Sequence, residues 1–325
     1  MASFLESLTQ VFTPDATQAV GKASGLDAVT VMKGLAVAGP LLLGAMSRRA
    51  STPDGLSGLS RLLPQDGGAG LGNLAAMFSG AAARPEMLGG LFGSGLSATS
   101  RTLDRKLGFR ASALLPLVVP VALSLLAKKK AAEKLDDQSI ARALQDEHTA
   151  LLAKGGEQSA LARSVLDAGM KGAELKARFT PEQWTRVRLA PGAAARLVML
   201  ASPSGALGLV KEANAAATAI ETARGASEPT SLISLAFDSD ISRDEVEVLG
   251  KDRGTTLNVL KEAVNLVSQK TPSELPAFAQ FIHGVALKVA EETKEGGFLG
   301  IGGTRVSREE QAVLDEIDSL TGAIA

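Results

Sequence analysis

The chain has 325 residues, of which 45% are apolar and only 3% aromatic, with one Trp and no Tyr. Its 34 basic and 35 acidic residues leave a net charge of -1, which does not suggest the basic surface that sequence-independent nucleic-acid binding requires. Cysteine is absent, which excludes disulfides, thiolate nucleophiles and cysteine-bound metal centres. A core of Ala, Leu and Val favours closely packed helices, so we expect an all-α protein.

The N-terminal segment MASFLESLTQVF carries no Lys or Arg and no long apolar run, and therefore does not resemble a secretory signal. Phe4, Leu5, Leu8 and Phe12 recur on one face of a short amphipathic helix. From these features we expect a cytoplasmic protein.

An internal repeat is the most informative feature of the first half. Residues 34–49 read GLAVAGPLLLGAMSRR, and residues 114–129 read LLPLVVPVALSLLAKK. At an offset of 80 positions, Pro40 aligns with Pro120 and Arg48-Arg49 with Lys128-Lys129. Each copy predicts a glycine turn (Gly25 or Gly108), an apolar helix with an internal proline, and a basic last turn that complements the helix dipole.

The apolar runs of this repeat could belong to a core or to a membrane. The longer, Ala111 to Ala127, has 17 residues and the shorter, Gly34 to Met46, has 13, whereas a spanning helix needs about 20. We therefore favour buried helices at the centre of one domain or of an oligomer. The predicted interaction residues on the second helix are Leu115, Val119, Leu123 and Leu126. The alternative is a peripheral membrane protein in which residues 111–127 enter lipid and Lys128–Lys130 contact head groups.

Between the two copies, residues 55–95 are rich in Gly and Ala. This composition predicts a long loop with short helices, or alternatively a surface that becomes ordered on assembly.

The segments SGLDAVTVMKGLAVAGPLLLGAMSRRASTPDGLSGL, LGFRASALLPLVVPVALSLLAKKK and LDDQSIARALQDEHTALL together resemble the YidB-like bacterial family of unknown function. The resemblance covers about residues 1–155. It implies an all-helical fold and provides no catalytic residues. The second copy departs from the family pattern Pro-Leu-x-x-Gly, because it reads PVALS from Pro120 to Ser124.

The second half, residues 156–325, predicts a C-terminal helical bundle that follows an N-terminal helical domain of residues 1–155. The sequences TPEQ from Thr180 and SREE from Ser307 are capping boxes that open helices. Pro191-Gly192 predicts a break after the first of these helices. Trp184, beside two arginines, either packs in the core or anchors a partner.

The segment GFLGIGGT, Gly297 to Thr304, matches part of the phosphate-binding loop pattern, but Gly303 occupies the lysine position. A helix rather than a strand precedes it. We interpret the segment as a joint between helices.

The stretch FDSDISRDEVE places Asp238, Asp240 and Asp244 at alternating positions. An EF-hand loop requires Gly at its sixth position and Glu at its twelfth, where this chain has Arg243 and Leu249. Helix caps are the preferred interpretation, and a weak cation site is the alternative.

His148 and His283, the two histidines, have no partner at metal-ligand spacing. We interpret them as packed side chains and expect no metal and no cofactor. No catalytic constellation is visible in the sequence. The favoured function is therefore a non-enzymatic structural or interaction protein that forms homo-oligomers. The alternatives are a membrane-associated protein, and a small-ligand binder or enzyme with a pocket in the C-terminal bundle.

Overall fold

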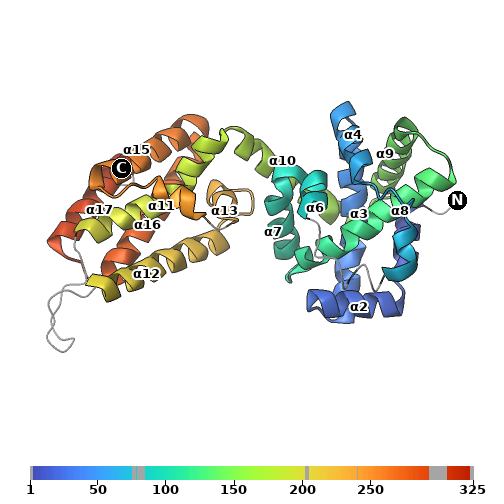
Figure 1. The fold of residues 1–325 in the computed structure, drawn as a ribbon, viewed down its shortest axis with the longest axis horizontal. Coiled ribbons are helices and arrows are strands. Elements are labelled where there is room, and N and C mark those ends of the chain that lie inside the picture. The colour runs from blue at the N-terminus through green and yellow to red at the C-terminus, as the bar shows by residue number, and fades with distance from the viewer. Residues whose placement is uncertain are drawn as a thin grey trace. The chain divides into compact units, whose positions relative to one another are not determined.

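The structure is a computed structural model of the chain, shown in Figure 1. It describes residues 3–74, 78, 85–201, 205–239, 241–292 and 306–322. Helices and turns are the only secondary structure within these ranges, so the predicted all-α fold is confirmed. The chain divides into two compact units, Met1–Ala173 (unit 1) and Glu174–Ala325 (unit 2). This division lies within a helix, α10 (Glu157–Ala177), whereas the sequence suggested a boundary just before that helix.

Unit 1 is built from short and medium helices around two long apolar ones. Its elements are α1 (Phe4–Val11), α2 (Pro14–Ser24), α3 (Ala28–Arg49), α4 (Pro53–Leu62), η1 (Ala69–Asn73), α6 (Pro85–Phe92), η2 (Gly93–Gly95), α7 (Leu96–Leu107), η3 (Ala111–Leu114), α8 (Leu115–Ala132), α9 (Asp137–Lys154) and most of α10. In Figure 1, α8 runs across α3, and the two helices contact each other. The Gly/Ala-rich segment 55–95 contributes short helices, with residues 75–77 and 79–84 outside the described ranges.

The two sequence copies fold alike at their glycine turns and prolines. The helix α2 ends at Gly25 with φ +74°, and α7 ends at Gly108 with φ +75°. This left-handed conformation carries a steric cost for any residue with a Cβ, which explains the glycines. The long helices that follow, α3 and α8, each contain the predicted proline, Pro40 or Pro120.

Both long helices lie in the core of unit 1. The residues predicted as an interaction surface on α8 are at most 2% exposed: Leu115, Val119, Leu123 and Leu126. The side chains of Leu41, Leu42 and Leu43 on α3 are 0% exposed. The chain's own helices therefore already enclose the apolar faces that the sequence had suggested for assembly.

The expectation that both apolar segments are too short to span a bilayer does not hold for the helices themselves. Ala28–Arg49 and Ala111–Ala132 are each 22 residues long and apolar enough to cross a membrane by length and composition. The helices exceed the apolar runs because residues 28–33 and 47–49 extend the first, and residues 128–132 extend the second. Within unit 1, 61% and 67% of their apolar windows are buried against other parts of the chain.

Unit 2 is a bundle centred on α11 (Pro181–Ala201), which packs along α15 (Arg253–Lys270) and α16 (Leu275–Glu292). The other elements are α12 (Gly205–Ala226), α13 (Leu232–Ala236), α14 (Arg243–Glu247), η4 (Pro272–Glu274) and α17 (Arg308–Thr321). Ser307 and Glu310 form the predicted capping box of α17. Thr180 and Gln183 exchange the reciprocal capping hydrogen bonds that open α11, at 3.0 and 3.3 Å.

The predicted break at Pro191-Gly192 is wrong, because α11 continues through Pro191. Pro191 removes one backbone donor and disfavours a helix interior. However, Leu189, Ala190, Ala193 and Ala194 beside it are at most 1% exposed. Burial of this helix on two neighbours outweighs the local preference of the proline.

Candidate functional site

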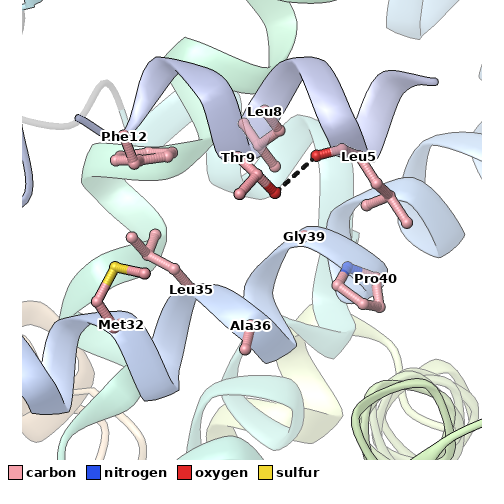
Figure 2. Close-up of a pocket in the computed structure, with 9 residues that line it drawn as sticks. All are labelled: Leu5, Leu8, Thr9, Phe12, Met32, Leu35, Ala36, Gly39 and Pro40. Carbon is pink, nitrogen blue, oxygen red and sulfur yellow. Dashed lines mark hydrogen bonds between the residues drawn. The ribbon is translucent and has the colours of Figure 1, made fainter. Parts of the chain in front are cut away.

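An apolar groove of about 280 Å³ lies between α1 and α3. Figure 2 shows its two walls facing each other: Leu5, Leu8, Thr9 and Phe12 from α1, and Met32, Leu35, Ala36, Gly39 and Pro40 from α3. Thr9 is the single polar side chain of this lining, and its hydroxyl donates to the carbonyl of Leu5 at 2.8 Å. The groove therefore suits an apolar occupant.

Two features hold α1 beside α3: the small size of Gly39 and a hydrogen bond to Glu147. A Cβ at Gly39 would lie 3.2 Å from the Cδ2 of Leu5, so the glycine lets α1 approach closely. The backbone N–H of Phe4 donates to Glu147 Oε2 at 2.8 Å. Glu147 also pairs with Lys129 of α8 at 3.1 Å. One carboxylate of α9 therefore ties the start of α1 to the end of α8 and fixes one wall of the groove.

The rim of this groove is apolar and exposed on the α3 side. Met32 lines the groove and is 49% exposed, and Val29, one turn earlier on α3, is 65% exposed. Glu6 of α1 and Lys33 of α3 are also exposed, and each is next in sequence to a residue that lines the groove. We use the term groove face for six apolar residues of α1 and α3: Leu5, Leu8, Phe12, Val29, Met32 and Leu35.

A second cavity, of about 310 Å³, lies at the C-terminal end of α3, and we call it the arginine cavity. Arg48, Arg49, Thr52, Ser94 and Thr99 contribute its polar lining. Arg49 Nε donates to the carbonyl of Leu91 at 3.3 Å. Burial lowers the pKa of Arg48, while the carboxylate of Asp167 acts in the opposite direction. The Arg48 residue as a whole is exposed, so its charge is only partly withdrawn from water.

The lysines that follow α8's apolar face are mostly paired. Lys129 pairs with Glu147, and Lys130 pairs with Asp137. Lys128 is exposed. The charge available to a lipid surface at this helix end is therefore smaller than the sequence Lys128–Lys130 suggests.

Trp184, the possible partner anchor, is 7% exposed and packs inside unit 2. Its ring lies 5.5 Å from that of Phe179 between centroids, and Lys176 Nζ lies 5.4 Å from the centroid of its ring. The indole is therefore already engaged within unit 2, in aromatic packing and in a cation–π contact.

The acidic stretch around Asp238 is organised by a cap and an arginine. Asp238 and Asp244 are exposed, and Asp240 lies outside the described residues, as do Gly297 to Thr304. Ser242 and Glu245 form a capping box at the start of α14. The Ser242 backbone amide, with a further contribution from Arg188, lowers the pKa of Glu245. Across the described ranges, no group of three or more His, Asp or Glu side chains could hold a metal ion.

Arg188 is a buried organising residue that the sequence did not single out as such. It is 9% exposed and pairs with Glu245 at 2.8 Å. It also donates to the carbonyls of Ala236 and Ser239, at 2.9 and 2.8 Å. The side chain thus holds the loop after α13 against α11. Its partners are about 50 or more positions away in the sequence, so no local pattern could reveal them.

The two histidines have different surroundings. His283 Nδ1 lies 2.6 Å from Asp318 Oδ1, joining α16 to α17. Sequence reasoning missed this pair because 35 positions separate the residues. His148 lies beside Gly44, where a Cβ would approach its Nε2 to 3.1 Å. Burial lowers the pKa of His148, and Arg48 and Arg163 lower it further.

The C-terminal bundle also carries a surface groove. A groove of about 380 Å³ lies between α11 and α15, and an ion pair of Arg186 and Glu262, 3.2 Å apart, lines it. Elsewhere in unit 2, Glu212 is 2% exposed, and its carboxylate oxygens have no hydrogen-bond partner within the described part of the chain.

These features define a two-unit, all-helical protein whose apolar groove and arginine cavity both lie in unit 1. Residues 6–129 match a family model described as a bacterial protein of unknown function (DUF937). The match contains both copies of the repeat, so the predicted resemblance of the N-terminal half to a bacterial family of unknown function is confirmed. It does not extend to the C-terminal half. No curated protein matches the chain. No solved structure matches it either.

Proposed function

We propose that this protein is a non-enzymatic interaction protein that self-associates through the groove face of unit 1. The observation that carries the proposal is the presence of a hole and a knob on one face. The hole is the apolar groove between α1 and α3, and the knob is the exposed pair Val29 and Met32 on the same helix.

A second copy of this chain is the occupant that such a face fits. In a two-fold dimer the same patch is used by both subunits, so a surface must be complementary to itself. A groove next to an apolar knob meets that requirement, because Met32 of one copy can enter the groove of the other while the reverse contact forms. Glu6 of α1 and Lys33 of α3 are both exposed, and their opposite charges suit pairing between the two subunits.

The proposed assembly surface is the groove face and not the set of residues that the sequence indicated. Leu115, Val119, Leu123 and Leu126 are at most 2% exposed within unit 1 and cannot meet a partner without unfolding. Trp184 is likewise packed by its neighbours. Self-association without disruption of unit 1 requires exposed apolar residues, and Val29 is the most exposed large one in the described chain.

Membrane association is a second candidate function, favoured by the length and apolar character of Ala28–Arg49 and Ala111–Ala132. For either helix to enter lipid, unit 1 would have to open and exchange its core contacts for lipid contacts. The pairing of Lys129 and Lys130 with acidic residues reduces the basic charge that would attract anionic head groups.

Light scattering coupled to size exclusion tests the self-association proposal. We expect the wild-type chain to be a dimer and Met32→Glu to be a monomer, because a buried interfacial charge is strongly unfavourable. Leu152→Glu is the matched control, since Leu152 is 39% exposed in the same unit and does not line the groove. It should remain dimeric.

Circular dichroism should show the same helix content for Met32→Glu and the wild type. A monomeric wild type, or a Met32→Glu chain that stays dimeric, would contradict the groove face as the interface. Flotation of the wild type with anionic vesicles, but not with neutral ones, would favour the membrane candidate instead.

A further inference from the structure

We propose that the arginine cavity binds the phosphate group of a small organic phosphate ester. The cavity measures about 310 Å³, which is close to the lower end of the usual range for small-molecule sites. Two arginines, Arg48 and Arg49, line it, and none of its described lining residues is acidic. A concave site with two cations and no anion in its lining favours a negatively charged ligand.

The two guanidinium groups suit a phosphate ester in charge and in hydrogen bonding. A phosphate monoester carries a charge of about -1.5 to -2 at neutral pH. The two arginines oppose this charge, and the Asp167 carboxylate, which is not in the lining, offsets part of the Arg48 charge. Arg49 uses its Nε to reach the carbonyl of Leu91, so that bond positions the side chain and leaves the terminal nitrogens as donors. Its Nη2 lies near Gly93, where a Cβ would be 3.8 Å away. Arginine forks match the spacing of phosphate oxygens.

Further donors surround the arginines. Thr52 caps α4, and its Oγ1 accepts from the N–H of Gly55 at 3.2 Å. Its hydroxyl proton therefore remains available to a ligand. Ser94 lies in η2, which leads directly into the twelve-residue helix α7, and no side-chain cap occupies the start of either element. The cavity thus collects two arginines, the hydroxyls of Thr52, Ser94 and Thr99, and the positive end of α4 at its cap Thr52.

Much of the remaining lining of the cavity is apolar. Leu166 and Met170 of α10 line it together with Leu91 and Phe92 of α6. A Cβ at Gly95 would lie 2.3 Å from the carbonyl oxygen of Gly169, so α10 meets the start of α7 backbone to backbone. This contact fixes the wall against which the organic part of the ester would pack. An anionic head with a compact apolar body therefore matches the cavity better than inorganic phosphate does.

Isothermal titration of the full chain with phenyl phosphate tests the site, with phenol as the uncharged comparison ligand. We expect saturable binding of phenyl phosphate and none of phenol. Arg48→Gln and Arg49→Gln should each raise the Kd about ten- to a hundredfold, because each removes charge-assisted hydrogen bonds. Arg61→Gln is the control, since Arg61 is on α4 and does not line the cavity.

The melting temperature of each variant should be measured beside its Kd, because Arg49 also bonds Leu91. Arg48→Gln has no such structural bond among the described residues, and so separates loss of binding from loss of folding. Absence of saturable binding by phenyl phosphate would overturn the proposal. So would equal affinity of the wild type and Arg48→Gln.

Vesicles distinguish a soluble ester from a lipid head group. If the source is lipid, vesicles containing phosphatidic acid should bind the chain, phosphatidylcholine vesicles should not, and phenyl phosphate should displace the former. If the source is a soluble ester, only phenyl phosphate should bind. Vesicle binding that survives the combined Arg48→Gln and Arg49→Gln substitutions would place the phosphate contact elsewhere and contradict the proposal. Met32 does not line this cavity, so the outcome is independent of self-association.

Discussion

The two copies of the repeat share a backbone plan but differ in how they meet their neighbours. The helix α3 carries glycines at positions 34, 39 and 44, and the positions 80 residues later hold Leu114, Val119 and Ser124. At all three glycines a neighbouring side chain approaches closely: Leu114, Leu5 and Leu166. In the first copy, these positions therefore leave space for side chains of neighbouring helices. In the second copy, the equivalent positions carry side chains themselves.

The contact of Gly34 with Leu114 shows the difference most clearly. A Cβ at Gly34 would lie 2.2 Å from Leu114 Cδ1, and these two residues are equivalent in the repeat. One copy thus supplies the knob, and the other supplies the hole, at the same position. Duplication of a sequence pattern has not produced two interchangeable helices here.

The basic ends of the two copies differ in the same way. Lys129 is paired with Glu147, whereas its equivalent Arg49 lines a cavity and bonds a backbone carbonyl. The groove between α1 and α3 is also on the first copy. Both candidate sites of unit 1 therefore involve α3, while α8 serves mainly as core.

The largest expected effect comes from equivalent core leucines. Leu43→Ala and Leu123→Ala should each reduce the free energy of unfolding by about 2–5 kcal/mol, because each leaves a cavity at a site that is 0% exposed. Chemical denaturation followed by circular dichroism measures the loss. Fluorescence of Trp184, which lies in unit 2, reports separately on the other half. A small loss for only one of the two leucines would show that the copies are not equally part of the core.

A double-mutant cycle on Gly34 and Leu114 should give an intermediate effect. Gly34→Ala should cost about 1–3 kcal/mol by overpacking, although alanine favours a helix over glycine by about 1 kcal/mol. In the Leu114→Ala background the same change should cost less, with a coupling of about 0.5–3 kcal/mol. Denaturation midpoints of the four chains provide the measurement. Gly89→Ala is a control, since a Cβ there meets nothing within 4 Å; strictly additive effects would contradict the knob-and-hole contact.

The smallest expected effect is a pH dependence from His148. Its pKa is lowered in the folded chain by burial, then by Arg48 and Arg163. The unfolded chain therefore takes up the proton first, and stability should fall as the pH drops from the ordinary value of 6.5 toward the lower folded pKa. Thermal melts across this range should show a weaker pH dependence for His148→Gln. Identical pH profiles for the two chains would mean that His148 does not contribute.

Local features of the fold could be predicted from the sequence. The left-handed turns at Gly25 and Gly108 and the capping box of Ser307 and Glu310 depend on a few adjacent residues, and each occurs as expected. The break at Pro191 was wrong because a local preference of the proline competes there with burial of the whole helix α11. Burial depends on neighbours that the local sequence does not specify.

The candidate sites could not be predicted in the same way. The arginine cavity joins the end of α3 to Ser94 and to Leu166, and the groove joins α1 to residues of α3. Glu147 positions α1 through a hydrogen bond to Phe4 across 143 positions. Spacing along one helix carries no information on such pairings. Sequence reasoning therefore placed the interaction surface on α8, an apolar helix that the core of unit 1 encloses.

The sequence alone was enough to predict that this protein is helical, to place several of its turns and caps, and to reveal that its first half repeats a helix unit. These properties follow from backbone preferences and periodicity, which act over a few residues. Which apolar faces are enclosed and which remain open became visible only in the packed fold. That choice depends on how helices distant in the chain share a limited apolar surface, and on glycines such as Gly34 that let one copy of the repeat pack into the other.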